Sequence, residues 1–203
     1  MENISMSIVM VVHNNDNVLE QNLQRFLQTA EAVSESEVIV VDDTSTDETP
    51  DILKRMKADN PRLHTTFMPQ SVYNKSRLQL ALTVGAKAAR HRRIVLADIT
   101  LPPVSSEWLS GLAEGTVALV RTRRKKSGYS LRYRRFDTFE AARPRLMKTG
   151  RRGSYCQRQA PWYCWWRRRY DAIAVDCDHV FDAIKCFDLP LTRWQLLKLR
   201  LSV

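Results

Sequence analysis

The chain has 203 residues, 44% of them hydrophobic and 27% charged, and its formal net charge is +10 at pH 7. This length and composition predict one folded domain with a substantial core, which excludes a disordered or fibrous chain. No apolar run approaches the ~18 to 20 residues that span a bilayer, so a membrane-spanning protein is excluded as well. The start of the chain, MENIS, lacks the basic segment of a secretory signal, so we expect a cytoplasmic protein.

Apolar runs alternate with amphipathic segments through the first half of the chain. The periodicity predicts strands near residues 7–12, 37–42, 63–68 and 93–98, and helices near 17–33, 47–58, 74–90 and 105–113. This alternation predicts an α/β fold, a mostly parallel, Rossmann-like sheet with helices on both faces. Further on we expect a strand at 116–121, a loop into a helix at 127–139, and a C-terminal amphipathic helix at 189–201.

The most informative stretch is VIVVDDTSTDET, residues 38 to 49. Its first four residues are apolar and mostly β-branched, as in a strand that is buried on both faces. Asp42 and Asp43 follow where this strand ends, and the Thr, Ser and Asp residues after them favour a turn into a helix. Because ligands of open α/β sheets bind at the carboxyl ends of strands, these carboxylates are candidate binding residues.

Several motifs together resemble the family 2 glycosyltransferases of the GT-A fold. The first two are MSIVMVVHNN (residues 6–15) and VIVVDDTSTDET, where the family has a strand ending in Tyr-Asn and then V-V-D-D-G-S-T-D. The third is the segment 76–109, with Ala81-Leu82, Gly85, Ala88-Ala89, Asp98-Ile99-Thr100, Pro102-Pro103 and Glu107-Trp108-Leu109. The resemblance covers roughly residues 5–115, and the C-terminal part diverges from it.

The resemblance implies a nucleotide-sugar site. In the family pattern Asp43 would accept a hydrogen bond from a uracil-type base, His13 and Asn14 would line that base, and Asp98 would face the ribose and diphosphate. The second Asp of the family's Asp-x-Asp metal motif is Thr100 here. Asp98 and Thr100 are therefore the expected ligands of a weakly bound divalent metal, Mn²⁺ or Mg²⁺. Lys75, Arg77 or the basic cluster downstream is a candidate to compensate by pairing with the diphosphate.

All of the excess positive charge lies in one segment. Between residues 121 and 169, Lys and Arg outnumber Asp and Glu by 17 to 2, and Trp and Tyr are interleaved near the end. Such a mixture is typical of an anionic membrane face or of a site for a diphosphate or lipid-phosphate acceptor. Nucleic acid is a less favoured partner, and a merely solvated surface or a degenerate tail remains an alternative.

We therefore predict a nucleotide-sugar glycosyltransferase that acts on a saccharide or lipid-linked acceptor, at the inner membrane face if it is peripheral. Residues 1–120 are expected to form the nucleotide-sugar-binding half, and residues 121–203 a basic acceptor-side or membrane-facing region of the same domain. The family outcome is inversion, in which a carboxylate deprotonates the acceptor hydroxyl. Asp176 and Asp178 are the candidate bases, from a faint resemblance of DCDHVF to the family's base motif. The competing hypothesis is a non-catalytic relative that binds a nucleotide or a membrane.

Overall fold

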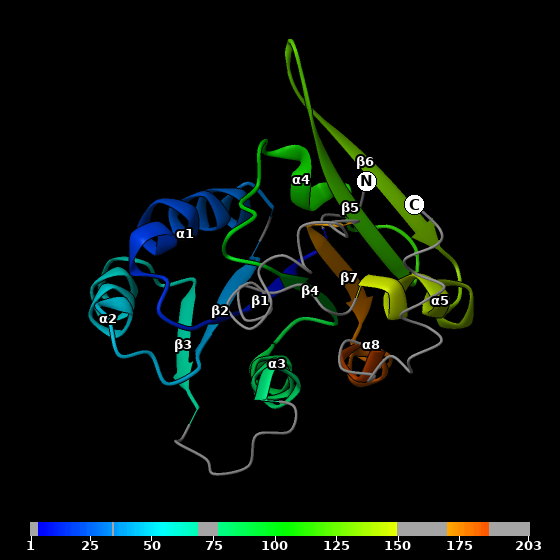
Figure 1. The fold of residues 1–203 in the computed structure, drawn as a ribbon. Coiled ribbons are helices and arrows are strands. Elements are labelled where there is room, and N and C mark those ends of the chain that lie inside the picture. The colour runs from blue at the N-terminus through cyan, green and yellow to red at the C-terminus, as the bar shows by residue number, and fades with distance from the viewer. Residues whose placement is uncertain (1–3, 34, 69–76, 150–169, 187–203) are drawn as a thin grey trace, which may run out of the picture.

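The computed structural model describes residues 4–33, 35–68, 77–149 and 170–186 (Figure 1). In the first half of the chain, strands and helices alternate. They are β1 (Met6–Val12), α1 (Asp16–Glu31), β2 (Glu37–Asp42), α2 (Thr49–Asp59), β3 (Leu63–Phe67), α3 (Arg77–Ala88), β4 (Arg93–Ala97) and the short α4 (Glu107–Ser110). Then follow β5 (Val117–Lys125), β6 (Gly128–Phe136), α5 (Phe139–Thr149), β7 (Ala172–Asp176) and α8 (Val180–Cys186).

The seven strands form one sheet in the order β3-β2-β1-β4-β7-β5-β6. Strands β1 to β4 are parallel, whereas β7 runs antiparallel to both of its neighbours, β4 and β5. The chain leaves β1 toward β2 on one side and returns to β4 on the other. The topological switch point, where open α/β sheets bind ligands, therefore lies between the carboxyl ends of β1 and β4.

Helices cover both faces of the sheet, which confirms the predicted α/β class. On one face, α1, α2 and α4 pack over the inward residues of β1 and β2, with Phe26 and Trp108 in an edge-to-face contact. On the other face, α3 and α8 pack over the alternate residues of the same strands, and α5 joins α8 over β5 and β7. Figure 1 shows α1 and α2 on one side and α3 and α8 below the sheet.

Two sequence predictions about the second half were wrong or incomplete. Most of the range 127–139, predicted as a loop into a helix, forms strand β6 (Gly128–Phe136), since Leu131 and Tyr133 alternate with arginines and pack against the core. The helix that follows, α5, begins only at Phe139. The sequence analysis also did not predict β7, which comes from the C-terminal part and lies between β4 and β5. The division expected at residue 120 falls inside β5, so both predicted parts contribute to one sheet. The C-terminal helix expected at 189–201 lies outside the described residues.

None of the helices in the described parts of the chain is long and apolar enough to cross a membrane.

Gly85 sets how closely α3 approaches the sheet. A Cβ at this position would lie 2.4 Å from Cγ1 of Val9 and 3.1 Å from Cγ2 of Val41. Helix propensity alone would make Gly85→Ala stabilising by ~1 kcal/mol, but overpacking a tight core costs ~1 to 3 kcal/mol. We expect the overpacking to win, so that Gly85→Ala lowers the midpoint of urea unfolding. Lys87→Ala, at an exposed position of the same helix, is the control and should leave the midpoint nearly unchanged. A Gly85→Ala protein that is more stable than the natural chain would contradict the close packing of α3 on the sheet.

Candidate functional site

Polar side chains gather at the carboxyl edge of the sheet, on both sides of the switch point. Val12 at the end of β1 lies beside Asp42 at the end of β2, so the next residues, His13 and Asp43, continue at the same level. Asp98 follows the end of β4 on the other side of β1. Neighbouring strands lie ~4.8 Å apart and the register offsets Asp98 by two residues from the level of Asp43, so these two residues are separated by about 12 Å across β1. The structure therefore places His13, Asn14, Asp43 and Asp98 at one edge.

Asp43 is the central carboxylate of this edge, and it is fully buried. Its oxygen Oδ1 accepts hydrogen bonds from Nε of Arg77 at 2.9 Å and from a terminal nitrogen of the same guanidinium. Its other oxygen, Oδ2, is shielded from solvent and has no hydrogen-bond partner among the residues that the structure describes. A buried hydrogen-bond acceptor without a partner costs on the order of 1 to 3 kcal/mol, so a hydrogen-bond donor on a bound ligand would remove that cost.

In the structure Arg77 pairs with a protein carboxylate, whereas the sequence analysis suggested a diphosphate as its partner. The other candidate, Lys75, lies outside the described residues. Its guanidinium neutralises Asp43 and also donates to Oγ1 of Thr44 at 3.4 Å. Only 13% of the Arg77 side chain is exposed. This guanidinium therefore lies against the buried carboxylate that carries the unsatisfied Oδ2.

The loops after β1 and β2 are connected by side-chain hydrogen bonds. The ring nitrogen Nδ1 of His13 lies 2.6 Å from the Asp43 carbonyl oxygen, and because a carbonyl only accepts, this nitrogen must carry the proton. The backbone N–H of Asn14 donates to Ser45 Oγ at 2.8 Å, and its own Oδ1 accepts from the N–H of Thr46 at 2.7 Å. These contacts fix the His13 ring beside Asp43.

The same loops contain backbone strain. Asn14 has φ of 48° and Thr44 has φ of 55°, a conformation that is unusual for a β-branched residue. Thr44 occupies the position at which the resembled motif has Gly, which adopts such angles without cost. Strained backbone that is held by surrounding hydrogen bonds is typical of binding and catalytic loops.

Asp98 and Thr100 bind each other. Oδ1 of Asp98 accepts from both the backbone N–H and the hydroxyl of Thr100, each at 2.9 Å. A site for Mn²⁺ or Mg²⁺ needs several oxygen ligands, yet the described residues contain no group of three His, Cys, Asp or Glu side chains placed around an ion. Asp98 and Thr100 by themselves offer one carboxylate and a hydroxyl that already donates to it, which is fewer oxygen ligands than such an ion needs.

A carboxylate that the sequence analysis missed, Asp171, lies at the same edge. Ala97 of β4 faces Ala172 of β7, so Asp98 and Asp171 follow at the next level outward on neighbouring strands. The Asp171 N–H donates to the Val120 carbonyl at 2.7 Å, and its Oδ2 accepts from the Thr122 N–H at 2.5 Å. The signal in the sequence was an Asp directly before the apolar run AIAV. At the other strands of the site the Asp follows the apolar run, and here it precedes the run because β7 is antiparallel.

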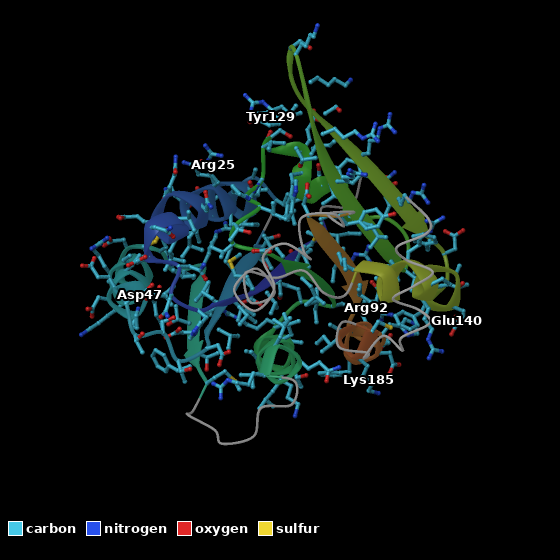
Figure 2. The ribbon with its side chains drawn as sticks, viewed as in Figure 1. Arg25, Asp47, Arg92, Tyr129, Glu140 and Lys185 are labelled. Atoms are coloured by element: carbon cyan, nitrogen blue, oxygen red, sulfur yellow. The ribbon has the colours of Figure 1, made fainter. Side chains whose placement is uncertain are left out.

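Asp176 and Asp178 lie at the opposite edge of the sheet. Asp176 faces Arg93, the first residue of β4, and because a strand rises ~3.3 Å per residue the two edges are about 13 to 17 Å apart. Arg93 is 3% exposed; burial lowers its pKa, and the 2.9 Å ion pair with Asp176 offsets part of that effect. Asp178 pairs with Arg92, near α8 in Figure 2. The structure therefore places both predicted bases away from Asp43 and Asp98, at the other edge of the sheet.

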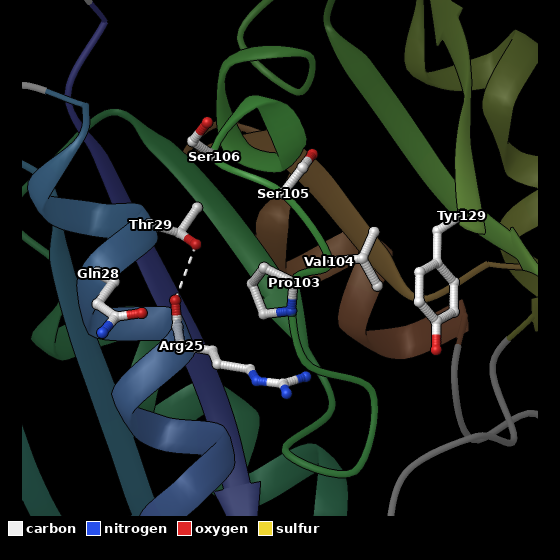
Figure 3. A pocket seen from close by; sticks show the side chains of 8 residues that line it. All are labelled: Arg25, Gln28, Thr29, Pro103, Val104, Ser105, Ser106 and Tyr129. Carbon is white, nitrogen blue, oxygen red and sulfur yellow. Dashed lines mark hydrogen bonds between the residues drawn. The ribbon is translucent and has the colours of Figure 1, made fainter. Parts of the chain in front are cut away.

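A pocket of about 440 Å³ lies on the α1 face and is separate from this edge (Figure 3). Residues of α1 line one side, the loop before α4 another, and Tyr129 of the β5–β6 hairpin the third. They are Arg25, Gln28, Thr29, Pro103, Val104, Ser105, Ser106 and Tyr129. The lining contains no carboxylate and none of the predicted site residues.

The fold and the strand-end site together define a GT-A type of glycosyltransferase architecture. The chain belongs to glycosyl transferase family 2, whose family model matches residues 7–171. No curated protein matches the sequence.

Among solved structures, the chain is similar to glucosyl-3-phosphoglycerate synthase from Mycobacterium tuberculosis in complex with Mn²⁺, UDP and phosphoglyceric acid. The identity is 16%, with 86% of this chain and 56% of that chain covered and a TM-score of 0.49. It is also similar to the mannosyltransferase PcManGT from Pyrobaculum calidifontis, with 22% identity, 59% and 35% coverage and a TM-score of 0.48. The chain thus spans little more than half of the one and about a third of the other, and at these identities the likeness concerns the fold.

Removal of Arg77 tests the buried ion pair. Arg77→Ala leaves the Asp43 carboxylate without its counter-charge, so we expect the free energy of unfolding to fall by ~3 to 5 kcal/mol. The double variant Arg77→Ala/Asp43→Asn removes the stranded charge and should recover much of this loss. Urea denaturation of the two single variants and the double variant measures the coupling. A coupling energy close to zero would show that the two side chains do not pair.

Proposed function

We propose that this protein transfers a sugar from a nucleoside-diphosphate donor to an acceptor hydroxyl, with inversion at the anomeric carbon. The observation that carries the proposal is the unsatisfied oxygen of the buried Asp43, at the carboxyl edge beside the switch point. Family membership supports a transferase. The cysteine spacing in the sequence, which suits reduced thiols, supports a cytoplasmic location.

In this proposal the base of the donor occupies the end of the site at Asp43. A base that presents a ring N–H, as uracil does, donates to Oδ2 of Asp43, while the His13 ring and the Asn14 backbone border the base. The separation of about 12 Å between Asp43 and Asp98 gives room for a nucleoside between them. Asp98 then faces the ribose and the start of the diphosphate, as the family pattern implies.

The base for the acceptor hydroxyl is assigned to Asp171. It is the described carboxylate on the strand next to Asp98, at the same level of the carboxyl edge. A carboxylate there can accept the acceptor proton as the hydroxyl oxygen attacks the anomeric carbon and the bond to the diphosphate oxygen breaks. The hydrogen bond from the Thr122 N–H to Oδ2 holds the carboxylate in place.

A second candidate function is favoured by one observation, the Thr at position 100. A relative that binds a nucleotide but does not transfer sugar would not need a metal site. The two functions differ in turnover, since both predict nucleotide binding but only the first predicts release of nucleoside diphosphate in the presence of an acceptor.

Thermal unfolding with a panel of nucleotide sugars, with and without Mn²⁺, tests donor binding. A donor at 100 times its dissociation constant adds ~2.7 kcal/mol to stability, which for a domain of this size raises Tm by about 5 to 10 °C. We expect one donor to do this and Mn²⁺ to add little.

Thr100→Asp is the matched variant, since a second carboxylate should make the stabilisation by the donor depend on Mn²⁺. If none of the nucleotide sugars in the panel stabilises the natural chain, the proposal is contradicted. A strong Mn²⁺ requirement of the natural chain would show that another group replaces the missing Asp.

Substitution of Asp171 tests the assignment of the base. Asp171→Asn keeps an oxygen that can accept from the Thr122 N–H but loses the proton acceptor, so we expect kcat to fall by ~10² to 10⁴ while donor affinity stays within about twofold. Asp176→Asn, at the opposite edge, is the control and should reduce stability without reducing kcat. Turnover is followed as released nucleoside diphosphate. If Asp171→Asn retains its turnover, or if Asp176→Asn loses as much, the assignment is wrong.

A further inference from the structure

One face of the β5–β6 hairpin carries positive charge without negative charge. Cross-strand partners share a face of the sheet, and the pairs Arg121–Arg132, Leu119–Arg134 and Arg123–Ser130 lie on the same face. We call the five cations of this face the basic face: Arg121, Arg123, Lys125, Arg132 and Arg134. All are exposed except Arg121, which is half-buried.

The basic face is costly for the protein by itself. Arg121 and Arg132 are directly opposite each other, and like charges in this arrangement destabilise a strand pair. Among the described residues, no carboxylate forms an ion pair with any of the five side chains. The other face of the hairpin differs, because Leu131 and Tyr133 pack on the core there and Arg135 pairs with Glu114 at 3.0 Å.

The register connects the basic face to the donor site. Val120 faces Ala172, so Arg121 and Asp171 lie opposite each other at the next level outward. Asp98 on β4 lies at this same level. Asp98, Asp171, Arg121 and Arg132 therefore form a row across four adjacent strands, and Arg121 is about 10 Å from Asp98. Beyond this row β5 continues for four more residues, roughly 13 Å, so the hairpin extends past the carboxyl edge, as Figure 1 shows.

The composition of the face favours isolated phosphate groups over a bilayer or a nucleic acid. Membrane anchoring places aromatic residues beside the cations, and single-stranded nucleic acids stack on aromatic rings. From Arg121 to the tip and back to Arg134, the basic face contains no aromatic residue. The exposed Tyr129, labelled in Figure 2, faces Arg124 and lies on the opposite face. Arg guanidinium groups are suited to bidentate phosphate binding.

We propose that the basic face binds the phosphate of a phosphate-bearing acceptor and so directs the acceptor hydroxyl toward Asp171. The identification of the ligand as an acceptor rests on the proposed function, whereas the anion site itself is defined by the residues of the hairpin. The phosphate lies on Arg121, Arg123 and Arg132, and the hydroxyl to be glycosylated lies on the Asp171 side of it. The donor diphosphate remains at Asp98.

Inorganic tripolyphosphate is the probe, titrated into the full chain by calorimetry with and without saturating uridine diphosphate. Arg123→Gln should weaken tripolyphosphate binding about threefold to tenfold, the loss expected for one exposed charge-assisted contact. Arg124→Gln is the matched control, because it removes the same charge from the next residue of the same strand on the opposite face. It should weaken binding less than about twofold, as expected from general electrostatics alone.

The outcomes separate this proposal from the assignment of the donor site. Unequal effects of the two variants, with affinity retained under saturating uridine diphosphate, support the basic face. Equal effects, or displacement of tripolyphosphate by uridine diphosphate, overturn it. Failure of uridine diphosphate to bind would contradict the donor site, while the comparison of variants would still decide the anion site. In a second arm, phosphatidylglycerol vesicles that bind the chain despite excess tripolyphosphate, and equally in both variants, would assign the hairpin to a bilayer and overturn the proposal.

Discussion

The direction of β7 decides which carboxylates can act together. Hydrogen bonding to β4 and β5 in antiparallel register brings the start of β7 to the carboxyl edge and its end to the amino edge. Asp171 is thereby placed beside Asp98, and Asp176 is placed on the buried guanidinium of Arg93, which also donates to three backbone carbonyls. A parallel β7 would have reversed these roles. One choice of strand direction thus separates a site residue from a structural one only five positions away.

Local patterns predicted the first half of the fold well, because β1, β2 and β4 are apolar runs and the long helices between the strands have an apolar stripe. The same reasoning failed at β6, where the arginines concealed the alternation of Leu131 and Tyr133. It placed Asp43 and Asp98 correctly at strand ends, since parallel strands end at one edge. It could not place Asp171 or Asp176, because the edge that a residue occupies depends on pairing between strands more than 70 residues apart. Arg77 was likewise beyond reach, since its partner is 34 residues away.

In the proposed site, the base of the donor lies at Asp43 and the diphosphate near Asp98. Thr100 supplies a hydroxyl where the family motif has a second carboxylate, which weakens any divalent ion there. Arg121 on the neighbouring hairpin supplies positive charge about 10 Å away, and further cations extend beyond it. In the proposal, the donor diphosphate stays at Asp98, and the exposed hairpin binds the phosphate of the acceptor.

The most direct test of this account is the nucleotide preference of Asp43→Asn. Arg77 donates to Oδ1, so the amide oxygen of Asn must face Arg77 and its NH₂ group must replace Oδ2. The variant therefore presents a hydrogen-bond donor where the natural protein presents a hydrogen-bond acceptor, so a ring N–H of the base has no partner there. Calorimetry should show uridine diphosphate binding weakened by ~1.5 to 3 kcal/mol, and cytidine diphosphate, whose ring nitrogen accepts, gaining relative to it. Unchanged affinity for both nucleotides in the folded variant would contradict the assignment of Asp43 to the base.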